Sequence, residues 1–76
     1  MIRFFFDLKT KNSIEHDYEG RFLPSLSHAQ QMAELIAMDV GCTRVDGSFY
    51  MEVQIRTASG CLLASTPVQL MDALAA

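Results

Sequence analysis

The side chains of this 76-residue sequence that could do chemistry are few and widely spaced. Imidazole and thiolate groups are the usual ligands of zinc, and the sequence has two histidines and two cysteines: His16, His28, Cys42 and Cys61. No C-x-x-C or H-x-x-x-H spacing occurs, and the four residues fall in four separate expected elements. We therefore predict no metal site, and we expect surface histidines and small apolar thiols instead.

Carboxylates offer a second possible chemistry. Glu15, Asp17 and Glu19 are two residues apart, so in an extended segment they lie on one face. Paired carboxylates perform acid–base catalysis where burial separates their pKa values, but here we expect a solvated acidic stripe. No G-x-S-x-G motif and no glycine-rich phosphate loop occurs. The sequence therefore predicts no enzyme, no catalytic residue, no cofactor and no small-molecule substrate.

Composition limits the protein to one small domain. Half of the residues are hydrophobic, which is enough for a single core in a chain of this length. We expect residues 1–76 to form one domain, with 68–76 as a short apolar tail. The formal net charge is −3, which argues against a nucleic-acid partner, because phosphate binding needs clustered lysine and arginine.

The sequence also predicts a compartment. The N-terminal apolar run ends at Asp7, so it is shorter than the ~7–15-residue core of a signal peptide. No stretch reaches the ~18 apolar residues of a membrane span. We expect a cytoplasmic protein with no membrane contact. In that compartment Cys42 and Cys61 stay reduced, although an even number leaves one disulfide open.

The N-terminal part predicts a hairpin. In residues 2–8 one apolar set alternates with a second, mixed set, which is typical of a half-buried strand; the sets are Ile2, Phe4, Phe6 and Leu8, and Arg3, Phe5 and Asp7. A polar turn follows at 9–12, and residues 14–18 alternate again. We expect the two strands to pair, and a loop to run from Gly20 to Pro24.

The C-terminal part predicts a second hairpin. Residues 49–56 give the clearest alternation, and the turn 58–60 leads to a shorter strand at 61–65. Pro67 cannot donate a ladder hydrogen bond, so it bounds that strand or marks an edge. The Asp46–Gly47 dipeptide favours a further tight turn, which either closes a small hairpin on 43–45 or leads into the next strand.

One helix lies between the hairpins. Ser27 is the expected N-cap, with Gln30 in the capping-box position, and Gly41 is the expected end. The apolar face has helical spacing and consists of Ala29, Met32, Ala33, Ile36 and Val40.

The fold class is therefore α+β. The order ββαββ predicts an antiparallel sheet of about four strands with the helix packed on one face. The side chains expected to face the helix are Ile2, Phe4, Phe6, Leu8, Ile14, Tyr18, Phe49, Met51, Val53 and Ile55.

Several of these segments resemble a family of small bacterial proteins classed only as a domain of unknown function. The similarity lies in R-F-F-F-D-L at 3–8, in E-G-x-x-L-P-x-L at 19–26 followed by Ala29, and in the Ser59–Gly60 turn. The resemblance covers nearly the whole chain. It implies a compact fold of two hairpins and a helix, and it carries no established activity or catalytic residues.

The sheet face away from the helix carries side chains that the expected core does not need. Arg3 and Phe5 lie there on the first strand, and Tyr50 and Arg56 on the third. Two exposed aromatic rings on a sheet are typical of single-stranded RNA readers, but acidic residues on the same face would repel phosphates. These are Glu15, Asp17, Glu19 and Glu52.

Leu35 and Met38 form a second candidate surface, on the back of the helix. They either receive the apolar tail or contact another chain. The sequence therefore predicts a small non-catalytic protein-interaction module that binds a protein partner or itself as a homodimer. The alternatives are an antitoxin-like or regulatory protein that binds a basic partner, and single-stranded nucleic-acid binding. The candidate contact residues are Phe5, Tyr50, Arg56, Arg3, Leu35 and Met38.

Overall fold

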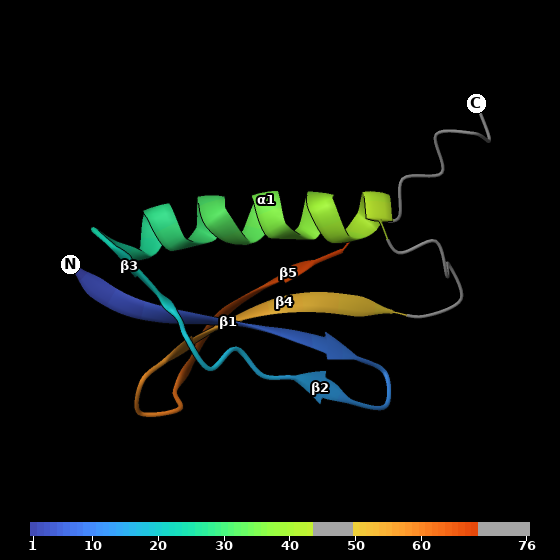
Figure 1. Ribbon diagram of the computed structural model, residues 1–76, viewed down its shortest axis with the longest axis horizontal. Coiled ribbons are helices and arrows are strands. Elements are labelled where there is room, and N and C mark those ends of the chain that lie inside the picture. The colour runs from blue at the N-terminus through green and yellow to red at the C-terminus, as the bar shows by residue number, and fades with distance from the viewer. Residues whose placement is uncertain (44–49, 69–76) are drawn as a thin grey trace.

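A computed structural model describes residues 1–43 and 50–68 of the chain. One helix packs on one face of an antiparallel sheet (Figure 1), so the predicted α+β fold is confirmed. The sheet order is β2-β1-β4-β5, and β3 pairs with β1. The elements are β1 (Ile2–Thr10), β2 (Ile14–Glu15), β3 (Arg21–Leu23), α1 (Leu26–Thr43), β4 (Met51–Thr57) and β5 (Leu62–Pro67).

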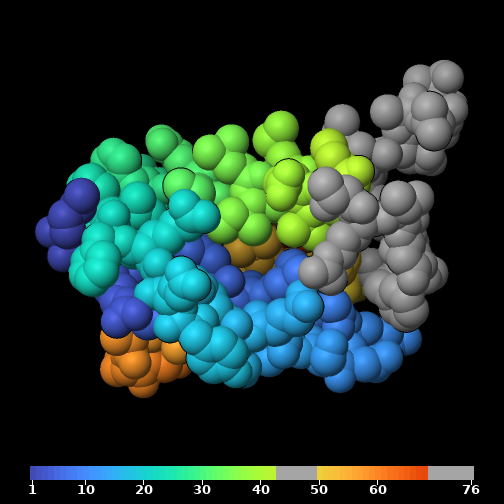
Figure 2. All heavy atoms as spheres, viewed as in Figure 1, coloured from blue at the N-terminus to red at the C-terminus, as the bar shows by residue number. Residues whose placement is uncertain are grey.

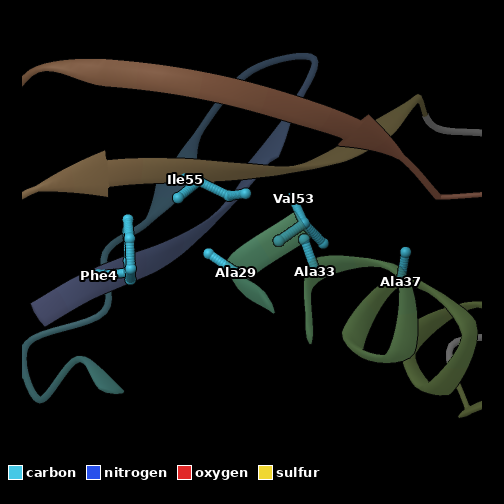
Figure 3. Close-up of a cluster of buried hydrophobic side chains, with 6 residues drawn as sticks. All are labelled: Phe4, Ala29, Ala33, Ala37, Val53 and Ile55. Carbon is cyan, nitrogen blue, oxygen red and sulfur yellow. The ribbon is translucent and has the colours of Figure 1, made fainter. Parts of the chain in front are cut away.

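The core lies between α1 and the two central strands (Figure 3). Its buried side chains are Phe4, Val53 and Ile55 from the sheet and Ala29, Ala33 and Ala37 from the helix. Three alanines four residues apart keep this side of α1 smooth, which allows close approach to the sheet. The predicted inward positions of β1 and β4 are confirmed for Phe4, Met51, Val53 and Ile55. In Figure 2 the opposite side of α1 forms an outer surface of the molecule.

Other predicted core positions are wrong. Ile2, Ile14 and Tyr18 are exposed. The reason is that the second strand is only two residues long and the chain then leaves the sheet, returning as β3 where we expected a loop. β3 is a strand that we did not predict, and it raises the number of strands from the predicted four to five.

The helix extends two residues beyond the predicted position at each end. Ser25 caps α1, because its Oγ accepts the backbone N–H of His28 at 3.3 Å and its carbonyl accepts the N–H of Ala29 at 3.1 Å. Ser27 lies inside the helix instead. Gly41 is buried within α1 and does not have a positive φ, so it does not end the helix.

The β4–β5 hairpin confirms the predicted turn at 58–60. The Gly60 N–H donates to the Thr57 carbonyl at 3.0 Å, and Gly60 has a φ of 93°, which suits a three-residue hairpin loop. β5 is longer than predicted and ends at Pro67 on the sheet edge. The expected turn at Asp46–Gly47, Phe49, and residues 69–76 of the tail lie outside the described residues.

Within the part of the chain that the structure describes, no helix is both long and apolar enough to cross a membrane.

Candidate functional site

The sheet face opposite α1, called the outer face below, carries a cluster of charged side chains built on an interrupted strand. β2 pairs with Leu8 and Lys9, and β3 pairs with residues 2–4. Five residues, 16–20, thus span the gap opposite the three residues 5–7. The extra length lets this segment leave the edge of β1 and contact side chains of the outer face.

Asp7 and Arg56 form the centre of the cluster. The Arg56 Nε donates to Asp7 Oδ2 at 2.7 Å, and Nη2 donates to Oδ1 at 3.2 Å. The Asp7 side chain is only 2% exposed. Its Oδ1 also accepts the backbone N–H of Asp17 at 2.9 Å, and His16 Nδ1 lies 3.6 Å from Oδ2. Asp7 is therefore a buried charge that is paired and hydrogen-bonded, as burial of a carboxylate requires.

Asp17 holds the segment 16–20 in place. Its carboxylate accepts backbone N–H groups of Glu19 at 3.0 Å, Gly20 at 3.1 Å and Phe6 at 3.1 Å. The Phe6 N–H faces the gap in the neighbouring strand, so the Asp17 side chain replaces a ladder partner there. The Asp17 carbonyl also accepts Arg56 Nη2 at 3.2 Å. The expected solvated stripe is thus wrong for Asp17, which is a structural acceptor.

Phe5 is buried under two guanidinium groups. The Arg3 and Arg56 guanidinium carbons lie 4.9 Å and 4.8 Å from its ring centroid, which is cation–π geometry. Arg3 is fixed by donating to the Glu19 carbonyl at 3.0 Å and 2.6 Å. Phe5 is 8% exposed. Our prediction of an exposed Phe5 is therefore wrong, because segment 16–20 and the arginines cover its ring.

Both carboxylates have lowered pKa values. Burial raises the pKa of Asp7, but the Arg56 hydrogen bond, the Asp17 N–H and the charges of Arg56 and His16 together hold it below 3.8. Burial likewise raises the pKa of Asp17, and the three backbone N–H groups outweigh that effect. Both groups are therefore anions at neutral pH.

A lowered pKa makes the cluster sensitive to acid. Such a carboxylate stabilises the fold above its unfolded-state pKa of ~3.9, and the contribution is lost as pH falls through the folded value. We expect the free energy of unfolding, measured by urea denaturation, to fall below about pH 4. In Asp7→Asn the fall should be shallower and the stability at pH 7 lower. Glu34→Gln, on the exposed side of α1, should behave as wild type; an Asp7→Asn profile parallel to wild type would contradict the assignment.

The cluster leaves little chemistry open to a substrate. Each oxygen of Asp7 and Asp17 accepts at least one hydrogen bond from the protein. In the described part of the chain, no group of three or more His, Cys, Asp or Glu could hold a metal ion. Ser25 Oγ and His28 Nδ1 lie 2.8 Å apart, but this exposed pair caps α1. The cluster therefore holds segment 16–20 against the outer face, and it is called the brace below; its residues are Arg3, Phe5, Asp7, Asp17 and Arg56.

The predicted contact residues separate into two groups. Arg3, Phe5 and Arg56 come together, but as parts of this brace. Tyr50, Leu35 and Met38 lie apart from it and are exposed, as is Arg3. Cys42 and Cys61 are exposed free thiols.

Sequence reasoning missed the structural roles of Asp7 and Asp17. One signal was present: Asp7 follows three phenylalanines in a strand, and Arg56 lies on the same face of the neighbouring strand. Asp7 is opposite Gln54, and Phe5 is opposite Arg56, so the two charges are diagonal neighbours within reach of a long side chain.

The comparisons with known proteins identify a family and assign no role. Residues 3–69 match the family model described as Domain of unknown function (DUF6894). No curated protein and no solved structure matches the chain. Since the matched residues include every described strand and the helix except Ile2, the chain belongs to the DUF6894 family.

Proposed function

We propose that this chain is a non-catalytic protein-interaction module of the bacterial cytosol, which binds a protein partner or a second copy of itself. The observation that supports the proposal is a pair of apolar side chains on the side of α1 that faces away from the sheet. Leu35 and Met38 are each 60% exposed. They are three residues apart, so their side chains are neighbours on the helix surface.

The helix does not use this pair to pack on the sheet. Its buried stripe consists of Ala29, Ala33 and Ala37, and the helical period of 3.6 residues puts Leu35 and Met38 on the other side. A single exposed leucine has no special meaning. Two large flexible apolar side chains together are typical of a binding surface, because methionine adapts to a partner and is enriched in interfaces.

Tyr50 is a further candidate contact. It lies just before β4, is exposed, and donates its hydroxyl to Glu52 Oε2 at 3.4 Å. Tyrosine is enriched in interface hot spots. Tyr50 takes part in none of the hydrogen bonds or cation–π contacts around Asp7 described above, so a change there should leave the fold intact.

The alternatives have less support. Base stacking on the outer face requires two accessible rings, and Phe5 is covered. Asp7 and Asp17 are occupied by Arg56 and by backbone N–H groups, so binding of a basic partner would rest on other exposed carboxylates such as Glu19 and Glu34. The two exposed free thiols favour a reducing compartment.

Affinity capture with a matched pair of helix variants tests the proposal. Leu35→Ser/Met38→Ser should lower the yield of the captured partner, or of a differently tagged copy of the chain, by about tenfold or more. Gln30→Ser/Gln31→Ser changes two exposed polar positions of the same helix and should leave the yield unchanged. Both variants should melt near the wild-type temperature, because surface substitutions cost little. Equal yields from both variants would contradict the proposal, as would a wild type that captures nothing.

A further inference from the structure

Strand β5 has an unpaired edge. It is the last strand of the sheet and pairs with β4 along one side. Among the described residues, no strand pairs with its other side. Two leucines lie at this edge, Leu62 at 58% and Leu63 at 40% exposure. Natural proteins usually protect such an edge with charge, but residues 61–68 contain no charged side chain.

The register shows which backbone groups of β5 point away from the sheet. The Val68 N–H donates to the Met51 carbonyl at 2.9 Å. Hydrogen-bonded pairs alternate in an antiparallel ladder, so Thr66, opposite Val53, also faces β4. Ser65 therefore directs both its N–H and its carbonyl outward. Pro67 directs only a carbonyl outward, because it has no N–H.

Ser65 is thus the centre of a short stretch that can pair. On one side Pro67 lacks a donor, and on the other the register shifts opposite Ile55 and Arg56. A regular strand from another protein would leave some of its own backbone hydrogen-bonding groups without partners, both opposite Pro67 and opposite the register shift. A second β5, antiparallel and centred on Ser65, places each Pro67 opposite Leu63 of the other copy, beside the register shift where regular pairing ends.

We propose that two copies of this chain pair antiparallel along β5 about a two-fold axis at Ser65; this deepens the proposed function, because it specifies its self-associating form. The two Ser65 residues exchange two N–H···O=C bonds, and each Leu63 packs against the other copy's Pro67. The chain carries a net charge of −3, but this edge is neutral, so the two strands meet without like charges in contact.

The assembly closes as a dimer. The opposite edge of the sheet consists of β2 and β3, which are interrupted by the segment 16–20. That edge offers no continuous strand, so growth of the sheet beyond two copies has no second site. A closed two-fold arrangement is also the commonest form of homo-oligomer.

Sedimentation velocity on the full chain at about 5–500 µM tests this pairing. The weight-average mass of wild type should rise towards twice the chain mass of 8.5 kDa. Ser65→Lys puts two lysines directly opposite each other, with their Cα atoms about 5.5 Å apart. Their like charges repel, so this variant should remain at 8.5 kDa across the range. Ser65→Glu should also remain monomeric, and an equimolar mixture of the two should regain the dimer at low salt.

Ser27→Lys adds the same charge at an exposed position of α1 and should dimerise like wild type. A wild type that stays monomeric, or a Ser65→Lys variant that dimerises like wild type, would overturn the pairing. Dimerisation lost in Leu35→Ser/Met38→Ser but kept in Ser65→Lys would also overturn it, while supporting the helix surface. A monomeric wild type that still captures a partner through Leu35 and Met38 overturns the β5 pairing alone.

Discussion

Replacing Phe4 with alanine should lower the free energy of unfolding by about 3–5 kcal/mol, the usual cost of deleting a fully buried aromatic side chain. Phe4 is 2% exposed and packs in the cluster between β1, β4 and α1 (Figure 3). A chain of this length has a total stability of about 4–11 kcal/mol. The variant should therefore lose a large part of its stability, and urea denaturation monitored by circular dichroism will measure the loss.

Phe22 provides a control of the same residue type. It lies on β3, is 61% exposed, and its ring centroid is 5.8 Å from the Arg3 guanidinium carbon. Phe22→Ala removes the same atoms without opening a cavity, so we expect a loss below about 1 kcal/mol. Similar losses for the two variants would show that the core does not lie where the structure places it.

Replacing Gly20 with alanine should cost about 2–4 kcal/mol, for two separate reasons. Gly20 has a φ of 73°, which an alanine adopts only with strain. A Cβ there would also lie 3.0 Å from the Phe4 carbonyl oxygen and 3.1 Å from Phe5 Cε1. The backbone and a buried ring give way poorly, so the added methyl should loosen the segment that covers Phe5.

Gly60 isolates the first of these two costs. It has a φ of 93°, and a Cβ there would meet nothing within 4 Å. Gly60→Ala should therefore be destabilised only by backbone strain, by about 1–2 kcal/mol. The difference between the two variants, measured in the same urea series, reports the crowding around Phe5. If Gly60→Ala is as destabilised as Gly20→Ala, the close packing of segment 16–20 is contradicted.

The parts of the fold that rest on regular patterns could be predicted from the sequence. The alternation in β4 correctly identified Met51, Val53 and Ile55 as buried, and the helical spacing identified Ala29 and Ala33. The helix ends could not be placed, because Ser25 and Ser27 are both suitable caps and only the geometry distinguishes them. The helical spacing also placed Leu35 and Met38 away from the apolar face of the helix, but it left open whether the apolar tail covers them.

The outer face could not be predicted, because side chains there complete the backbone pairing. Period-two reasoning treats 14–18 as one strand, whereas Asp17 uses its carboxylate to satisfy the Phe6 N–H across a gap. Once residues 16–20 leave the ladder, they cover the face that alternation assigns to solvent. Phe5 and Asp7 are buried for that reason, and no local pattern around either residue contains this information.

The central position of β1 has a consequence for how the chain folds. The first strand of the sequence pairs along most of its length with β4, from Phe4 opposite Thr57 to Thr10 opposite Met51. During synthesis the ribosome releases the N-terminus first, so β1 emerges long before its principal neighbour. Contacts this distant in sequence slow folding. The phenylalanines of β1 therefore have no long strand partner until residues 51–57 have been synthesised.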